Sequence, residues 1–371
     1  MKLLGRSAIA LLMIFLFSYF PSLSYASSIT SFEGKTSFLL SEAPHRNLSG
    51  EFFDRSLEAK LGVKGSLGRL LTEMGKIRAS ERVFYIDPML IEEVVDLSDG
   101  FLVEGVESIE PSVNANQWLT RFRTLAATSE VVALNYGAPD IVWLLKSAPS
   151  EQRINQQLSR DLLSSLLGVE VSNRNLTALI DPTQQPKKIE VGITRNFTSA
   201  RKALRSINRY VPTEETRRLR VLATRMLNTQ ADQDLAERFS RNFRESVNQY
   251  EDSLRISKGR FTLTSSLEKV PVTIINDFDN DLPISLSIKS TNTRVRVSQP
   301  PLTNVPANSK IVVEVPVEVL SSGQSELLVT MRVNESYRVG EQVRLRLNLA
   351  VISPLTTWIT TGSGVILLSQ P

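Results

Sequence analysis

The length and composition of the chain indicate a globular protein with room for two domains. It has 371 residues, of which 42 % are hydrophobic and 22 % charged, and this balance excludes wholesale disorder. The formal net charge of +4 is too small to indicate a nucleic-acid-binding protein.

Thiol and imidazole groups are almost absent. The sequence has no cysteine and a single histidine, His45, which lies in a polar stretch that we expect to form a loop. A thiol nucleophile and a thiolate metal site are therefore excluded, and a zinc hydrolase usually needs two or three imidazoles. A serine triad needs a histidine placed beside its serine, and we do not expect His45 to be catalytic. We expect no metal and no cofactor.

The first 26 residues are typical of a cleavable signal peptide. Lys2 and Arg6 give a positive start, residues 8–17 form an apolar run, and Ser24 and Ala26 are the small residues that a signal peptidase reads. The run is short for a spanning helix; an uncleaved anchor is the alternative. In either case we expect the rest of the chain outside the cytoplasm, in the cell envelope or secreted.

Residues 27–197 alternate between short strands and helices. Apolar residues at helical spacing predict a helix over 66–77. A β-branched and aromatic run over 82–86 predicts a strand, which leads through Asp87 into a helix over 89–95. This step from strand to helix is the repeating unit of an α/β domain.

The same step recurs further along the chain. A helix around Trp118 leads to a strand over 130–134, and Asp140 then precedes another helix. Further strands are expected over 176–180 and 189–193. Strands separated by helices imply parallel pairing, so we expect an α/β domain with either a barrel-like or an open parallel sheet.

The pattern changes after residue 197. Three helical segments are expected over 198–210, 213–228 and 231–253. From about residue 260 the apolar residues recur at every second position, with turn residues between the runs. Six or seven half-buried antiparallel strands in this space predict an all-β immunoglobulin-like sandwich.

These patterns predict five parts of the chain. They are a signal peptide (1–26), an α/β domain (27–197), a helical region packed on the α/β domain (198–256), an immunoglobulin-like β-sandwich (257–352) and a C-terminal tail (353–371).

Several segments resemble one uncharacterised family. In the β region these are 262–266 (TLTSS), 270–277 (VPVTIIND) and 282–286 (LPISL). In the α/β region, 84–90 (FYIDPML) resembles the family pattern W-V-V-D-P-x-L. The pair 118–122 and 131–137 (WLTRF, VVALNYG) is similar to W-L-x-R-L followed by V-L-A-L-P-Y.

The resemblance implies a function in the cell envelope. The family consists of actinobacterial, exported and membrane-anchored proteins with a domain of unknown function, often encoded beside the MviN-type lipid II flippase. Its members are generally longer, so the α/β domain here is expected to be a trimmed version. They also end in a transmembrane helix, of which residues 353–371 resemble a remnant.

Three residues at the ends of predicted strands are the candidate site. Asp87, Tyr136 and Asp140 follow strands at the edge where α/β folds place ligands, so we predict a shallow binding site there. Asp87 and Asp140 are also the candidate catalytic pair of a carbohydrate-active hydrolase. Alternatively, both carboxylates cap helix N-termini.

Two other polar patterns have simpler interpretations. Asp277, Asp279 and Asp281 have the spacing of a calcium loop, but Leu282 stands where glycine is required. We interpret them as an acidic hairpin loop. The basic residues of 217–220 are interpreted as a solvated helix face, with contact to anionic lipid or wall polymers as the alternative.

Taken together, the sequence predicts a non-catalytic, exported protein of the cell envelope. We expect it to bind or scaffold an envelope protein or glycan partner, with links to peptidoglycan assembly and to the membrane, and to bind no nucleic acid. The alternative function is the carbohydrate-active hydrolase, and an enzyme is the less expected outcome.

Overall fold

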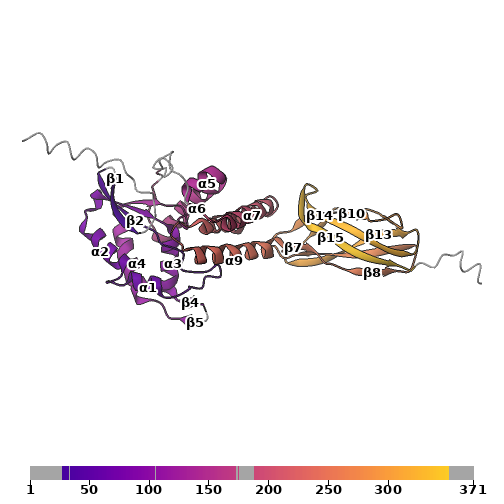
Figure 1. The fold of residues 1–371 in the computed structure, drawn as a ribbon, viewed down its shortest axis with the longest axis horizontal. Coiled ribbons are helices and arrows are strands. Elements are labelled where there is room, and N and C mark those ends of the chain that lie inside the picture. Colours follow the sequence, from indigo (N-terminus) through magenta and orange to yellow (C-terminus); the bar gives the residue numbers. More distant parts are fainter. Residues whose placement is uncertain (1–26, 33, 105, 173, 175–187, 351–371) are drawn as a thin grey trace, which may run out of the picture. The chain divides into compact units, whose positions relative to one another are not determined.

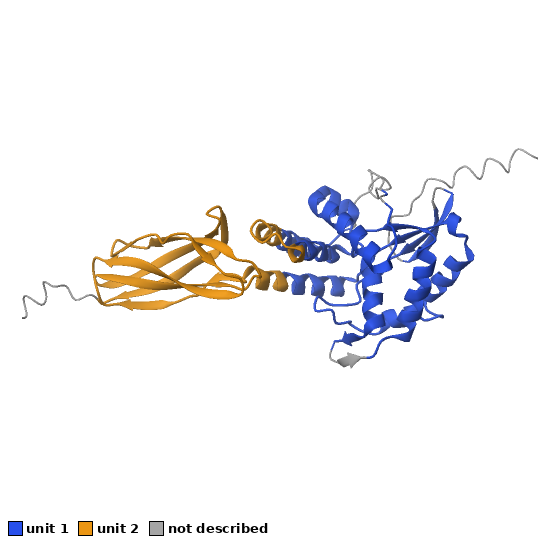
Figure 2. Ribbon diagram, turned by 180° about the vertical axis from the view of Figure 1, so that it is seen from behind, with its two compact units in different colours: residues 1–201, 217–244 blue, residues 202–216, 245–371 orange. Residues whose placement is uncertain are grey.

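The computed structural model describes residues 27–32, 34–104, 106–172, 174 and 188–350. The expected signal peptide, the strand over 176–180 and the tail from 353 therefore lie outside the described residues. The chain divides into two compact units, each discontinuous in sequence (Figure 2). Unit 1 contains residues 1–201 and 217–244, and unit 2 contains residues 202–216 and 245–371.

Unit 1 is built on an open sheet, of which Figure 1 labels the strands β1 and β2. Its strands have the order β1-β2-β3-β6. The strands are β1 (Ser28–Phe32), β2 (Lys35–Leu40), β3 (Arg82–Ile86) and β6 (Glu130–Ala133). β2, β3 and β6 pair in parallel and β1 is antiparallel to β2. The α/β class is confirmed, as a mixed open sheet. A separate ribbon pairs β4 (Phe101–Val103) with β5 (Val106–Ile109).

The central strand β3 is buried on both faces, because helices cover both. Phe84 and Ile86 of β3 contribute to the larger core, which also contains Trp118 and Phe122. Val83 and Tyr85 of the same strand face a second, smaller core. Strand residues alternate in direction, so a strand covered on both faces has an unbroken apolar run, as over 82–86.

The helices connect and cover the strands. In chain order they are α1 (Ser56–Leu61), α2 (Ser66–Lys76), α3 (Pro88–Asp99), α4 (Val113–Ala126), α5 (Ile141–Ser147), α6 (Pro149–Leu167), α7 (Val191–Ile207), α8 (Glu214–Ala223) and α9 (Gln233–Glu251), with short 3-10 turns over Ala79–Glu81 (η1) and Thr224–Leu227 (η3). The division between the units falls within α7, α8 and α9.

The strand predicted over 189–193 is wrong, because α7 begins at Val191. Three alternating apolar residues are too short a pattern to define a strand. The longer helical pattern decides the structure: Ile193, Phe197, Leu204 and Ile207 are buried on one side of α7, at helical spacing, whereas Val191 is exposed.

Unit 2 contains two antiparallel-rich sheets, and the predicted immunoglobulin-like class is confirmed. One sheet has the order β12-β10-β14-β15-β8 and the other β11-β13-β9-β7. The strands are β7 (Leu254–Ile256), β8 (Arg260–Leu263), β9 (Leu267–Asn276), β10 (Leu282–Ser290), β11 (Val295–Val297), β12 (Thr303–Val305), β13 (Ser309–Val319), β14 (Gly323–Val333) and β15 (Tyr337–Leu349). All pair antiparallel except β8, which runs parallel to β15.

The apolar side chains at alternate positions of the unit 2 strands fill the space between its two sheets. Val270, Val272 and Ile274 of β9 are buried, as are Val315 and Val317 of β13, and all belong to one core. β7 ends at Ile256 and pairs with β9, so the sheet that contains β9 begins before residue 257, where the sandwich was expected to start. The predicted domain boundaries remain predictions, because a division by contacts does not test which parts fold independently.

The acidic segment 277–281 connects the two sheets, since β9 and β10 belong to different sheets. The prediction of a hairpin loop there is therefore wrong. Asp279 accepts a hydrogen bond from Asn308 Nδ2 at 2.8 Å, and Asp281 accepts one from the Ala307 amide at 2.9 Å. These carboxylates tie the connection to the turn that precedes β13.

Among the described residues, no helix is both long enough and apolar enough to cross a bilayer.

We expect Asn276 to be essential for the stability of the sandwich. Its side chain is fully buried; Nδ2 donates to the carbonyl oxygens of Asn280, Val305 and Pro306, and Oδ1 accepts from the Phe278 amide. Asn276→Ala leaves these groups unpaired and should lower the free energy of unfolding by about 2–4 kcal/mol, measured by hydrogen exchange of the sandwich amides.

Asn276→Asp should be at least as destabilising at neutral pH, because a carboxylate would face three carbonyl oxygens. The control is Asn280→Ala, at an exposed position of the same connection, with an expected change within about 0.5 kcal/mol. Equal protection of the sandwich amides in the two alanine variants would contradict this role of Asn276.

Candidate functional site

The carboxyl ends of β2, β3 and β6 meet at one edge of the unit 1 sheet. The Asp87 amide donates to the carbonyl of Leu40, at the end of β2, and the Leu134 amide donates to the carbonyl of Ile86, at the end of β3. The segments that follow these strands therefore leave the sheet side by side. In open α/β sheets this edge is where ligands bind.

Asp87 lies inside this edge. Its side chain is fully buried; Oδ1 accepts from the Met89 amide at 2.9 Å and from the Gly137 amide at 3.0 Å. The first contact caps α3, with proline at the first helical position as the sequence predicts. Oδ2 has no hydrogen-bond partner among the described atoms. Burial raises the pKa of the Asp87 carboxyl to about 7, against the two amide hydrogen bonds, which lower it.

Gly137 allows two segments to approach closely. Its φ of +78° is in the left-handed region, and a Cβ there would lie 2.7 Å from Cγ of Arg225. Any larger residue would therefore push away the arginine of η3 and strain the turn after β6.

Tyr136 is held from both ends. Its amide donates to Asn155 Oδ1 at 2.7 Å and to Ser159 Oγ at 2.9 Å, both on α6. Its hydroxyl donates to Glu92 Oε2 at 2.6 Å. Burial, together with the neighbouring charge of Glu92, raises the pKa of the Tyr136 hydroxyl above its ordinary value. The phenol is thus a neutral hydrogen-bond donor.

Asp140 caps the next helix. Its carboxylate accepts from the Trp143 amide at 2.8 Å, at the start of α5, and its own amide donates to the carbonyl of Leu227. The side chain is buried. The interpretation that both aspartates cap helix N-termini is therefore confirmed. Ligand binding by Asp87, Tyr136 and Asp140 stays a prediction.

Two neighbouring glutamates of α3 form the centre of a buried ionic network. Glu93 has no exposed surface and accepts from the His45 amide at 3.2 Å; its Oε2 lies 3.1 Å from His45 Nδ1. Nη2 of Arg225 lies 3.8 Å from Oε1 of Glu93. Burial alone would raise the pKa of the Glu93 carboxyl. The hydrogen bond and charge of His45, together with the charges of Arg225 and Arg46, have the larger effect and lower this pKa.

Glu92 continues the network toward the surface. Its Oε2 lies 2.5 Å from Nη2 of Arg46, and its Oε1 lies 2.9 Å from Nη2 of Arg218 on α8. Arg46 also forms an ion pair with Asp96. Arg225 donates to the carbonyl of Arg46 at 2.7 Å. The network therefore joins α3, the segment after β2 and the α8–η3 segment into one framework.

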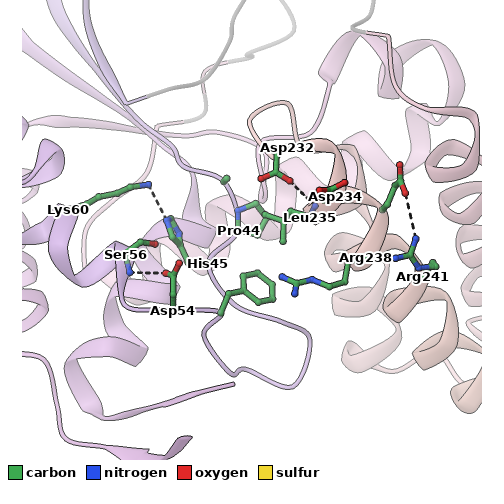
Figure 3. Close-up of a pocket in the computed structure, with 13 residues that line it drawn as sticks. Pro44, His45, Asp54, Ser56, Lys60, Asp232, Asp234, Leu235, Arg238 and Arg241 are labelled. Atoms are coloured by element: carbon green, nitrogen blue, oxygen red, sulfur yellow. Dashed lines mark hydrogen bonds and ion pairs between the residues drawn. The ribbon is translucent and has the colours of Figure 1, made fainter. Parts of the chain in front are cut away.

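An open pocket lies beside His45, within unit 1. Its volume is about 630 Å³, and Figure 3 shows His45, Lys60 and Arg238 among its lining residues. One wall comes from residues 43–60 and the other from residues 232–241, in and just before α9. The full lining consists of Ala43, Pro44, His45, Phe53, Asp54, Ser56, Lys60, Asp232, Asp234, Leu235, Glu237, Arg238 and Arg241.

The pocket and the ionic network were not predicted from the sequence. His45 was expected in a loop and not as a catalytic residue, and it contributes to both the network and the pocket. The adjacent pair Glu92 and Glu93 lies between the apolar residues 89–91 and 94–95 of α3, and this was the available signal, because carboxylates on a core-facing helix need buried cations. In the described part of the chain, no group of three metal-ligating side chains could hold a metal ion.

These features define a class: a protein with a polar site at the carboxyl edge of an α/β unit, followed by an immunoglobulin-like sandwich. Residues 119–367 match a family of unknown function, DUF6049. Because the match covers more than half of the chain, the protein belongs to this family. The resemblance to a family with a domain of unknown function is confirmed to this extent. No protein with a curated description matches the chain.

Solved structures share the fold of the C-terminal β region. A Salmonella alpha-2-macroglobulin mutant is 14% identical, with a TM-score of 0.22, over 26% of this chain and 7% of that chain. The Caenorhabditis elegans MSP family member WR4 is 12% identical, with a TM-score of 0.21, over 26% and 98%. The ASH/PapD-like domain of human CEP192 is 13% identical, with a TM-score of 0.22, over 27% and 86%. This chain thus spans a small part of the macroglobulin, and the likenesses concern the fold alone.

Asp87 should make unit 1 less stable as the pH rises. Its pKa is about 7 when folded and near 3.9 when unfolded, so between these values folding takes up a proton. Its contribution is favourable at low pH and is lost as the pH rises toward 7. Relative to Asp87→Asn, the free energy of unfolding of the wild type should fall by about 1.4 kcal/mol per pH unit within this range.

The measurement is urea unfolding from pH 4 to 8, followed by the fluorescence of Trp118 and Trp143 in unit 1. Asp99→Asn, at the exposed end of α3, should keep the pH dependence of the wild type. Parallel stability curves for the wild type and Asp87→Asn would contradict the prediction.

Proposed function

We propose that this protein is a non-catalytic, exported component of the cell envelope that binds a protein or glycan partner during envelope assembly. The observation that carries the proposal is the pocket beside His45, an open polar cavity with side chains of both charges. The buried network behind it fixes His45 in place, and a pre-organised pocket reduces the cost of binding.

The positions of the two aspartates favour binding over hydrolysis. A glycoside hydrolase needs two carboxyl groups that face the scissile bond in an accessible cleft. Asp87 and Asp140 are buried, and each gives a carboxylate oxygen to a helix N-terminus. Neither of them lines the pocket.

Export and an actinobacterial envelope location are supported by the sequence. The order of residues in 1–26 is that of a secretory signal, and the segments described above resemble exported proteins often encoded beside the lipid II flippase. Membership in DUF6049 is consistent with this resemblance. A function near peptidoglycan synthesis is what this resemblance implies.

We expect the mature protein to begin at Ser27. Expressed with its first 26 residues in an actinobacterial host, it should be recovered outside the cytoplasm, and mass spectrometry of the intact chain should give the mass of residues 27–371. Ala26→Trp should block cleavage, because the peptidase accepts only a small residue there. Tyr25→Trp is the matched control and should be processed normally. A wild-type chain that retains residues 1–26 in the cytoplasm would refute export.

We expect the mature protein to bind envelope material without degrading it. It should sediment with insoluble envelope fractions that contain peptidoglycan, and chromatography of the supernatant should detect no released glycan. Phe53→Ala, which removes the aromatic ring of the pocket, should reduce the retained fraction by about fivefold or more, the size expected for a buried contact. Tyr337→Ala removes an exposed aromatic ring from unit 2 and is the control.

Two outcomes would overturn the proposal. One is the absence of retention by any envelope fraction, protein or polymer. The other is steady release of glycan products that Asp87→Asn or Asp140→Asn abolishes, which would establish the hydrolase instead.

A further inference from the structure

Arg238 is the cation of the pocket that remains available for a ligand. It is exposed, and its guanidinium carbon lies 4.8 Å from the centroid of the Phe53 ring. Within the described parts of the chain it has no carboxylate at ion-pair distance. The ring therefore positions the guanidinium by a cation–π contact and leaves its hydrogen-bond donors free.

The other cations of the pocket are already paired. Lys60 Nζ lies 2.8 Å from Glu42 Oε2, and Arg241 lies 3.6 Å from Glu237 of the same helix. Lys60 also reaches His45 Nε2 at 3.3 Å. In the neutral tautomer that carries its proton on Nδ1, His45 donates to the carboxylate of Glu93 and its Nε2 accepts a hydrogen bond from Lys60. These contacts hold Lys60 and His45 in place at one end of the pocket (Figure 3).

Two acidic residues of the pocket, Asp54 and Asp232, are hydrogen-bond acceptors held by backbone amides. Asp54 accepts from the Ser56 amide at 2.8 Å, and its hydrogen bonds with Ser56 lower the pKa of its carboxyl. Asp232 accepts from the Leu235 amide at the start of α9. Ionised carboxylates accept hydrogen bonds from hydroxyl groups, so these residues suit a polyhydroxylated ligand.

We propose that this pocket binds a sugar that carries a carboxylate, with the carboxylate paired to Arg238. The inference rests on the proposed function, because it names the ligand class of the same pocket. Arginine presents two parallel N–H groups that match the two oxygens of a carboxylate. The carboxylates of Asp54 and Asp232 accept hydrogen bonds from the hydroxyl or amide groups of the sugar.

A sugar fits this lining better than a peptide does. Docking of a peptide as a helix uses an apolar groove, and docking as an extended strand uses pairing with a sheet edge. Here the walls come from a loop, the short helix α1 and the start of α9, and most of the lining side chains are polar or charged.

The test uses two disaccharides with the mature full chain. One is N-acetylglucosaminyl-N-acetylmuramic acid, which has a lactyl carboxylate, and the other is N,N′-diacetylchitobiose, which is neutral. Titration followed by calorimetry should show that the neutral disaccharide binds about tenfold more weakly, the size expected for one charge-assisted contact. Arg238→Gln should reduce this difference to about twofold or less.

Two further variants keep the test specific. Arg238→Lys keeps the positive charge but removes the two parallel N–H groups of the guanidinium. It should therefore retain only part of the preference for the carboxylate. Arg78→Gln removes an equal charge at an exposed position outside the pocket and should leave the preference unchanged. Unfolding temperatures equal to that of the wild type confirm that the variants are folded.

Each result decides the inference. Preference for the acidic sugar that depends on Arg238 supports it. Equal binding of both sugars, an unchanged preference in Arg238→Gln, or no binding of either sugar overturns it. In the last case, retention of the protein by other envelope material would leave the proposed function intact, whereas its absence would remove both.

Discussion

A carboxylate with no access to water, Glu93, constrains the arrangement of unit 1. Taking a charge out of water is costly unless cations and hydrogen-bond donors surround it, and loss of one partner leaves the other uncompensated. The partners of Glu93 come from distant parts of the chain: His45 follows β2, and Arg225 lies in η3. The buried glutamate therefore selects the one packing that brings both segments to α3.

The ionic network around Glu93 also positions residues at the pocket beside His45. His45 bonds to Glu93 through its amide and Nδ1, and the opposite ring nitrogen reaches Lys60 at the pocket. Gly137 allows Arg225 to come close to the turn after β6. The apolar cores and the ionic network thus act together: the cores stabilise the layers, and the network fixes which loops meet at the carboxyl edge.

The sequence predicts those features that local patterns determine. The strand Arg82–Ile86 follows from the apolar and aromatic run over 83–86, and the cap by Asp87 follows from Asp-Pro before a helix, so both agree with the structure. The sandwich follows from long alternation. The pocket was missed because its walls, residues 43–60 and 232–241, are far apart in sequence, and no local pattern reports that His45 is buried or that it meets Glu93. The error at 189–193 arose where a short alternating run lay inside a longer helical one.

The interleaving of the two units has a consequence for the order in which the chain folds. Residues 202–216 belong to unit 2 but precede 217–244, which belong to unit 1. During synthesis from the N-terminus, unit 1 is incomplete until residue 244 has been made, and residues 202–216 precede all the β-strands of their own unit. Neither unit is therefore complete before part of the other has been synthesised.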